Sequence, residues 1–272
     1  MIGAAVRGGV ELAFARRGAR TILARSRVDS PMATVRPFQL PDGGLVVQLI
    51  TLGPGLCAGD SVHIDIEAGE GARVIVTTTA ATRVMSMEAD GRAEQRVRLR
   101  AARHATLEYY PCVTIPFPGS AFQQTIHVAA DADARVAVVE AWALGRTARD
   151  EYLCFARISS RTTLDVDNVT IYADVTDLDP SSHCELAGAG VLDKRRYVAS
   201  GFWYGVTLDV APDAVGCDGA VSVAFGQSRP RLAYLRALAD DAPAMDEVLR
   251  RSAERVGTAW RLPAVRLDRF RC

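Results

Sequence analysis

The densest group of side chains able to bind a metal ion lies in residues 57–67. Its members are a thiol, an imidazole and three carboxyl groups, at Cys57, Asp60, His63, Asp65 and Glu67. Mixed donors of this kind suit borderline metals such as nickel or zinc. Residues 61–67 also alternate between apolar and polar side chains, which predicts a half-buried strand with a solvated polar face. The pattern therefore allows either a metal site or an ordinary strand surface.

A second candidate chemistry rests on three glutamates beside aromatic or apolar segments, Glu108, Glu140 and Glu151. Two carboxyl groups that face each other across a β surface could hydrolyse a glycosidic bond, and neighbouring aromatic rings would suit a sugar. Ion pairing explains the same residues, because buried charges need partners and Arg146 and Arg149 stand close to Glu151. A cytoplasmic β-helix enzyme that acts on carbohydrate with paired glutamates therefore stays open as an alternative.

Other familiar catalytic patterns do not occur in the sequence. It has no phosphate-binding loop that ends in Gly-Lys-Ser or Gly-Lys-Thr, no Gly-x-Ser-x-Gly elbow and no His-Glu-x-x-His pair. His183 and Cys184 are neighbours, so a strand would point their side chains to opposite faces. The threonines at 77–79 fit a strand more simply than they fit a ligand set.

The composition indicates a neutral protein of the cytoplasm. Lysine and arginine together number 32, as do aspartate and glutamate, so charge gives no argument for nucleic acid or an anionic membrane as partner. The first residues lack the apolar run of a secretory signal, and no segment approaches the ~20 apolar residues of a membrane span. The 6 cysteines are scattered, which favours free thiols in a reducing compartment.

A unit of strand, alanine-bearing turn and strand occurs three times between residues 61 and 142. The turns cover residues 68–74, 101–107 and 130–136, and their second alanines, Ala72, Ala105 and Ala134, recur about every thirty residues. Before them, residues 53–60 form a turn with glycines at Gly53, Gly55 and Gly59, where positive φ is permitted. Further strands are predicted at 21–27, 44–52, 152–177, 196–210 and 220–225. The sequence thus predicts an all-β, β-helix-like body of stacked strands.

Only the last fifth of the chain has helical periodicity. Ser228 is predicted to cap a helix that carries Leu232, Leu235 and Leu238, and a second helix follows with an apolar stripe over residues 245–260. No long polar linker separates this part from the strands. We therefore expect a single domain over residues 1–272, with a β body at about 1–227 and a small helical segment at about 228–261.

Several motifs together resemble the family of the urease accessory protein UreD, called UreH in some organisms. They are SPMATVRPF at 30–38, the glycine turn ending at Asp60, VTTTAATRV at 76–84, LEYYP at 107–111, IPFPGS at 115–120 and EAWALGRTARDE at 140–151. The resemblance marks as structural motif residues Gly53, Gly55, Gly59, Thr78, Thr79, Glu108, Pro111, Gly145, Arg146 and Glu151. The chain departs from the family pattern at Ala58, at Cys112 and Val113, and in the tail at 266–272.

The resemblance implies a β-helix-like body with a small helical part. It also implies a role without catalysis in the maturation of urease, the nickel enzyme that hydrolyses urea. Proteins of this family bind apo-urease and a helical UreF-like accessory protein, through which a UreG-like GTPase is recruited. The resemblance further implies an internal passage for nickel, with no tightly bound cofactor. An interaction scaffold that handles no metal stays open as a second alternative.

For such a passage the sequence offers Asp60, His63, Asp65 and Glu140 as groups that nickel would meet in transit, with Cys57 as a further candidate. A moving cation needs carboxylate or imidazole groups spaced along its way, each binding weakly enough to release it. Scattered donors suit transit better than a closed tetrahedral site, which would retain the metal.

Overall fold

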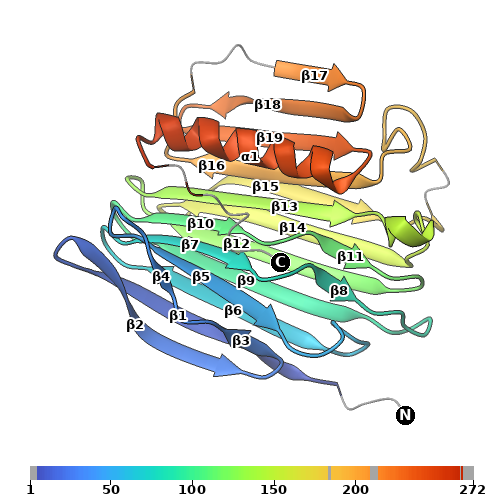
Figure 1. Cartoon of the computed structure of the whole chain (residues 1–272), viewed down its shortest axis with the longest axis horizontal. Helices are drawn as coiled ribbons and strands as arrows, with labels where there is room; N and C mark the ends of the chain where they lie inside the picture. The colour runs from blue at the N-terminus through green and yellow to red at the C-terminus, as the bar shows by residue number, and fades with distance from the viewer. Residues whose placement is uncertain (1–4, 183–184, 209–213, 264, 266–272) are drawn as a thin grey trace.

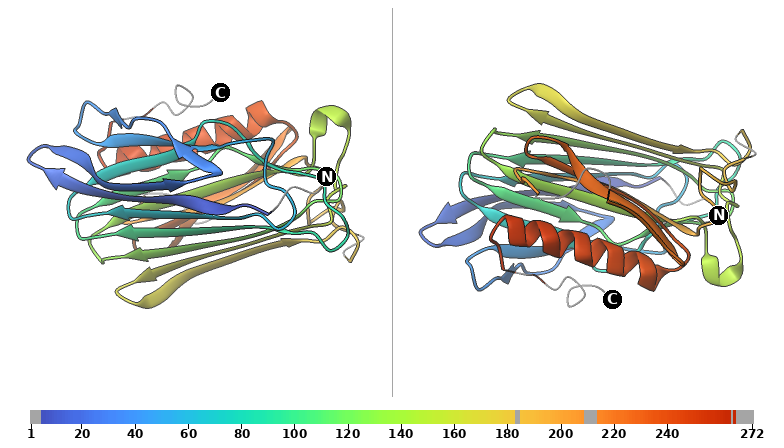
Figure 2. Two further views of the ribbon diagram at one scale, coloured as in Figure 1. Left: turned by 90° about the horizontal axis from the view of Figure 1, so that it is seen from below. Right: turned by 90° about the horizontal axis from the view of Figure 1, so that it is seen from above.

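The chain folds into two β-sheets that face each other, with a helix on the outer side of one of them (Figure 1, Figure 2). The computed structural model describes residues 5–182, 185–208, 214–263 and 265. Within these residues the strands form a 7-stranded sheet, called sheet A, and a 12-stranded sheet, called sheet B. The all-β, β-helix-like architecture with a C-terminal helix, expected from the sequence, is confirmed.

Sheet A has the strand order β15-β14-β12-β9-β6-β1-β2. Its strands are β1 (Arg7–Arg17), β2 (Arg20–Asp29), β6 (Ser61–Ala68), β9 (Ala93–Ala101), β12 (Ala121–Ala130), β14 (Arg157–Val166) and β15 (Val169–Leu178). Sheet B has the order β17-β18-β19-β16-β13-β10-β7-β5-β3, with β4, β8 and β11 attached beside this path. Its strands are β3 (Met32–Thr34), β4 (Phe38–Gln39), β5 (Leu45–Thr51), β7 (Arg73–Thr78), β8 (Thr82–Val84), β10 (Thr106–Tyr110), β11 (Thr114–Pro116), β13 (Arg135–Ala143), β16 (Tyr197–Tyr204), β17 (Ala214–Asp218), β18 (Val221–Arg229) and β19 (Leu232–Ala239).

The middle of the fold is a stack of coils that correspond to the three repeats in the sequence. Each coil passes from sheet A through an alanine-bearing turn into sheet B, as β6 to β7, β9 to β10 and β12 to β13. Successive coils pair in parallel without slippage, so that equivalent residues stand side by side, as do Ala68, Ala101 and Ala130. The turns are also bonded to one another. Thr106 N donates to Ala72 O at 2.8 Å, and Arg135 N donates to Ala105 O at 2.9 Å.

Inward-pointing apolar side chains fill most of the space between the two sheets. On sheet A they include Val62, Ile64, Val97, Leu99, Phe122 and Ile126, and on sheet B they include Val74, Val76, Leu107, Tyr109, Val136 and Val138. The opposite face of sheet A is exposed and carries charged residues such as Arg96, Arg98 and Arg100. Removal of this inner apolar surface from water is the main source of the stability of the body.

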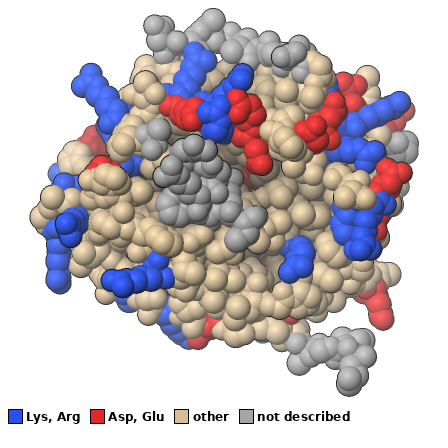
Figure 3. Space-filling model, viewed as in Figure 1, with Lys and Arg blue, Asp and Glu red and all other residues tan. Residues whose placement is uncertain are grey.

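The outer face of sheet B is also apolar, and helix α1 (Ala242–Ala259) covers part of it. Asp241 caps the helix by accepting a hydrogen bond from Ala244 N at 2.8 Å. From the helical segment, Met245, Val256 and Trp260 pack on a cluster that includes Val139, Trp203 and Leu235. Figure 3 shows charged side chains along the helix and around the rim of this face, with few below the helix. Within the described residues, no helix has the length and apolar character needed to cross a membrane.

The prediction of a helix that begins at Ser228 and carries Leu232, Leu235 and Leu238 is wrong. These residues lie in β18 and β19, and only the second predicted helix is present, as α1. Leu232 and Leu238 face the space between the sheets, whereas Leu235 belongs to the outer cluster beneath α1. Leucine and alanine favour a helix only weakly, and pairing with β16 and β18 on the two sides of β19 overrides that preference.

Removal of side-chain volume between the sheets should destabilise the fold far more than the same change at the surface. Leu107 is 0% exposed, whereas Val175 on β15 is 55% exposed. We expect Leu107→Ala to lower the free energy of unfolding by about 2–5 kcal/mol. Val175→Ala should change it by less than about 0.5 kcal/mol. Denaturant titration of both variants measures the difference, and equal effects would contradict the placement of the core between the sheets.

Candidate functional site

Polar side chains form a row between the two sheets, in a space that apolar groups otherwise fill. We call this set the interior polar row. Its members are Gln95, Gln124, Ser160, Thr162 and Asp174 on sheet A, and Glu140, Ser200 and Arg236 on sheet B. All of them except Asp174 and Arg236 are buried, so the row is enclosed along most of its length and reaches the surface at one end.

The pairing register places these residues at one level across neighbouring strands. On sheet A, Gln95 is opposite Gln124, which is opposite Ser160. Two residues along β14, Thr162 is opposite Asp174. On sheet B, Glu140 is opposite Ser200, which is opposite Arg236. The row therefore runs across the strands, perpendicular to the chain direction.

Glu140 lies at the middle of the row and is bonded across the gap between the sheets. Gln124 Nε2 donates to Glu140 Oε1, and Thr162 Oγ1 donates to Glu140 Oε2 at 3.1 Å. Gln124 Nε2 also lies 3.1 Å from Ser160 Oγ, and Gln124 Oε1 accepts from Gln95 Nε2 at 2.7 Å. The hydrogen bonds that hold this buried carboxyl group thus come from uncharged donors.

Burial raises the pKa of Glu140 to about 7, and hydrogen bonds from Gln124 and Thr162 offset part of the rise. Asp174 contributes in the same direction as burial, since its negative charge is close enough to disfavour a second carboxylate. The Glu140 carboxyl group is therefore poised between its neutral and charged forms near pH 7. A carboxyl group in this state can release its proton when a cation approaches.

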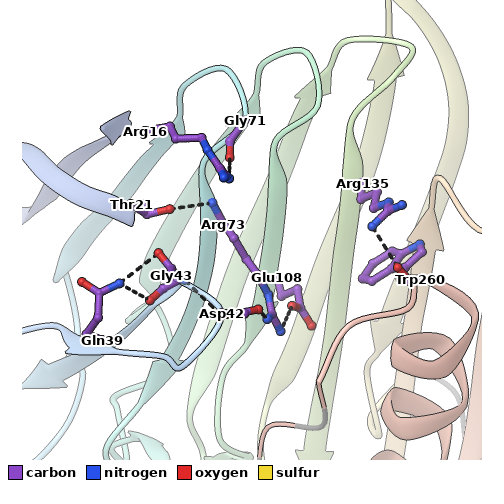
Figure 4. A network of polar contacts seen from close by, with 11 residues as sticks. Arg16, Thr21, Gln39, Asp42, Gly43, Gly71, Arg73, Glu108, Arg135 and Trp260 are labelled. Atoms are coloured by element: carbon purple, nitrogen blue, oxygen red, sulfur yellow. Dashed lines mark hydrogen bonds and ion pairs between the residues drawn. The ribbon is translucent and has the colours of Figure 1, made fainter. Parts of the chain in front are cut away.

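A second polar cluster lies on the outer face of sheet B (Figure 4). The Arg73 guanidinium forms an ion pair with Asp42, and its Nη2 lies 3.7 Å from Glu108 Oε1. Tyr110, on the same face, accepts a hydrogen bond from Trp203 Nε1 at 2.9 Å. Burial raises the pKa of Glu108, and the charge of Arg73 partly offsets this. The cluster borders a cavity of about 770 Å³ between sheet B and α1.

The glutamates considered for glycoside hydrolysis do not share a cleft. Glu108 belongs to the outer cluster, whereas Glu140 faces the space between the sheets. A pair of carboxyl groups that acts on one glycosidic bond must flank that bond. Glu151 is bound by Arg146, whose Nε and Nη2 each lie 2.5 Å from one of its oxygens. Ion pairing and hydrogen bonding therefore account for all three glutamates.

The polar side chains of residues 61–67 lie on the outer face of sheet A, away from the interior polar row. His63 Nε2 lies 3.8 Å from Glu11 Oε1, and Asp65 Oδ1 accepts a hydrogen bond from Arg98 Nε at 2.9 Å. Glu67 lies 3.7 Å from Arg25. Ion pairs this exposed contribute little stability. The strand-surface interpretation of these three residues is the one that the geometry supports.

Asp60 closes the glycine turn through its own side chain. Its Oδ1 accepts from Val6 N and its Oδ2 from Cys57 N, both at 2.8 Å. Cys57 is an exposed free thiol, and partial burial together with the charge of Asp60 raises its pKa. Among the described residues, no group of three or more His, Cys, Asp or Glu side chains is placed to hold a metal ion. The neighbours His183 and Cys184 and the tail at 266–272 lie outside these residues.

The remaining motif residues shape turns and loops. At Gly145 φ is 119°, and a Cβ there would lie 1.8 Å from Glu151 O. Arg146, besides binding Glu151, stacks on Phe117 with 4.2 Å between the guanidinium carbon and the ring centre. The other members have these places: Gly53, Gly55 and Gly59 have positive φ, Thr78 Oγ1 accepts from Cys112 N at 2.9 Å, Thr79 N donates to Leu49 O at 3.0 Å, and Pro111 lines the outer cavity.

The sequence pattern indicates Glu140 but none of its partners in the interior polar row. A signal for two of them was present, because Gln95 and Gln124 occupy positions that strand alternation assigns to the apolar face. Buried polar residues at such positions on neighbouring strands are expected to bond one another. No comparable signal existed for Ser200 and Arg236, because their place depends on the pairing of β13, β16 and β19.

The family model and the relatives that match this chain all carry the description of one family of urease accessory proteins. A family model described as UreD urease accessory protein matches residues 6–270. The urease accessory protein UreD of Deinococcus radiodurans is 34% identical over 250 residues, which cover 92% of this chain and 89% of the relative. UreD 1 of Synechococcus sp. is 39% identical over 196 residues, with 71% and 72% covered. UreH of Helicobacter acinonychis is 26% identical over 152 residues, with 56% and 57% covered.

Loss of the Asp60 carboxyl group should destabilise the fold, because it leaves two backbone N–H groups without their acceptor. We expect Asp60→Ala to lower the free energy of unfolding by about 1–3 kcal/mol. Asp65→Ala removes a carboxyl group from a surface ion pair and should cost less than about 1 kcal/mol. Thermal or denaturant unfolding of the two variants tests this, and a larger loss in Asp65→Ala would contradict the assignment of Asp60 to the turn and Asp65 to the surface.

The raised pKa of Glu140 should make stability depend on pH. The folded protein holds this proton more tightly than the unfolded chain, in which the pKa is near 4.5. The contribution is complete below that value and is lost as the pH rises through about 7, at about 3 kcal/mol in total. Glu140→Gln has no carboxyl group and should lose this pH dependence. Unfolding measured below pH 4.5 and above pH 7 tests it; identical pH profiles would contradict the prediction.

Proposed function

The chain belongs to the UreD family of urease accessory proteins, and from this membership we propose that it helps to load nickel into apo-urease. In this role it is a scaffold without catalysis. It binds apo-urease and a UreF-like helical accessory protein, and through the latter a UreG-like GTPase. Nickel is cargo rather than a resident cofactor. Family membership supports the role in urease maturation, and the interior polar row supports passage of the metal through this chain.

The interior polar row is the single observation that favours passage over mere docking. Polar groups between two apolar layers are costly unless they are hydrogen-bonded, so a row of them across several strands needs a reason beyond packing. Apart from Arg236, its side chains offer carboxylate, amide and hydroxyl oxygens as metal ligands, and each strand that carries them contributes only one or two. A cation that moves along such a row meets single weak ligands and can leave each of them.

Glu140 is the member of the row best suited to receive a divalent cation. Its bonds come from the side chains of Gln124 and Thr162, whose amide and hydroxyl oxygens can also face a cation after rotation. Because its pKa is about 7, the carboxyl group can remain neutral when no cation is near and lose its proton when one arrives. Asp60, His63 and Asp65 lie apart from the row. His63 and Asp65 could meet nickel only on the outer face of sheet A, and both oxygens of the buried Asp60 are already bonded to backbone N–H groups.

Deletion of this gene in cells that carry the urease cluster tests the maturation role. With nickel supplied, the cells should still make urease, but the purified enzyme should contain little nickel and show little activity. Complementation with the intact gene should restore both. Fully metallated, active urease in the deletion strain would overturn the proposal. If nickel content stays normal and only assembly with partners fails, a scaffold that handles no metal is the better description.

The route through the row is tested by Glu140→Gln, which keeps the size of the side chain but removes its charge. We expect complementation with this variant to lower the nickel content of urease several-fold, while the variant still co-purifies with urease. Glu70→Gln is the matched control, because the Glu70 side chain is 68% exposed and lies in a turn. Normal nickel content with Glu140→Gln would show that the metal does not pass this carboxyl group.

A further inference from the structure

The two sheets do not end at the same place. Sheet A ends at β15, whereas sheet B continues beyond β16 through β19, β18 and β17 (Figure 1, Figure 2). The space between the sheets therefore opens to the surface between β15 and β19. A cavity of about 390 Å³ lies at this opening and is lined by both strands. The interior polar row reaches the surface at this cavity.

An ion pair between the sheets occupies this opening. The guanidinium of Arg236, on β19, is bound to Oδ1 of Asp174, on β15. The two side chains differ in exposure, at 9% for Asp174 and 47% for Arg236. The carboxylate is thus held inside the opening, while the arginine reaches it from the solvent side.

The next carboxyl group inward from this pair is Glu140. Arg236 and Glu140 are both opposite Ser200, one on each side of β16. Thr162, which donates to Glu140, is opposite Asp174 in sheet A. The charge of Asp174 helps to raise the pKa of Glu140, and the charges of both carboxyl groups help to raise the pKa of Tyr172. Asp174 and Glu140 are therefore successive carboxyl groups of the interior polar row.

We propose that the β15–β19 opening is the port through which a divalent cation enters or leaves the interior polar row, and that Arg236 is the positioning residue that holds it closed. The proposal rests on the function proposed above. In the resting state the guanidinium supplies the positive charge that a nearly buried carboxylate requires. A divalent cation that reaches the opening takes its place on Asp174. The guanidinium then turns into solvent, a small movement because the Arg236 side chain is already half exposed.

The exchange of the guanidinium for a cation on Asp174 explains why the port should neither admit stray cations freely nor hold the metal tightly. With Arg236 in place, the carboxylate of Asp174 is compensated and the opening attracts stray cations weakly. With the cation bound, return of the guanidinium competes for Asp174 and favours onward movement or release. The side chain therefore sets the affinity of the port without being a ligand.

Binding of Ni²⁺ alone to the purified full-length chain tests the port, by equilibrium dialysis at fixed pH. Loss of a positive charge beside the carboxylates should raise the affinity of Arg236→Gln for Ni²⁺ about tenfold. Asp174→Asn should lower the affinity, and Arg236→Lys, which keeps the charge, should behave like the unaltered protein. Arg229→Gln is the matched control, since Arg229 lines the same cavity but is not part of the ion pair.

Equal Ni²⁺ affinity in Arg236→Gln and Arg229→Gln would overturn the port, as would the absence of binding in every variant. Circular dichroism and unfolding midpoints of each variant separate a change in affinity from loss of the fold. Failure of the two proposals can be told apart in the complemented cells. If Glu140→Gln lowers the nickel content of urease while Arg236→Gln and Asp174→Asn leave it unchanged, the route stands and the port is wrong. If Glu140→Gln has no effect either, the route itself is wrong.

Discussion

The fold depends on the parallel pairing of successive coils without slippage. Because β6, β9, β12 and β14 pair residue for residue, each inward side chain has its equivalents directly beside it. A slip of one residue would turn the apolar face of a strand to solvent and break the interior polar row. The turns help to hold this register, since their second alanines, Ala72, Ala105 and Ala134, are buried where a larger side chain would not fit.

The same sheet carries two buried glutamates with different partners. Glu108 on β10 faces outward and is compensated by the guanidinium of Arg73, whereas Glu140 on the neighbouring β13 faces inward and is held by Gln124 and Thr162. A carboxylate beside a fixed positive charge has little to gain from a further cation. A carboxyl group held by neutral donors can exchange its proton for one. The two faces of sheet B therefore have different chemistry, although both are largely apolar.

Much of the architecture could be predicted from the sequence, because period-two alternation and the alanine turns are local signals. The candidate site was harder to predict from the sequence than the architecture. The cluster of Asp60, His63 and Asp65 is conspicuous in sequence, yet the fold uses Asp60 to close a turn and leaves the other two in surface ion pairs. The helical spacing of the leucines at Leu232, Leu235 and Leu238 led to a wrong prediction of a helix. A strand buried on both faces shows no alternation of apolar and polar residues that would identify it in the sequence.

By itself the sequence determined the strand faces, the repeat, the glycine turns and the family, all of which depend on residues close together in the chain. The place of Glu140 in a largely apolar stretch was also visible in the sequence. Only the tertiary structure decided which distant polar residues meet it. Gln95, Ser200 and Arg236 come from strands far apart in the chain, and the pairing that brings them to one level depends on the packing of whole sheets. Side-chain spacing along one strand carries no information about that packing.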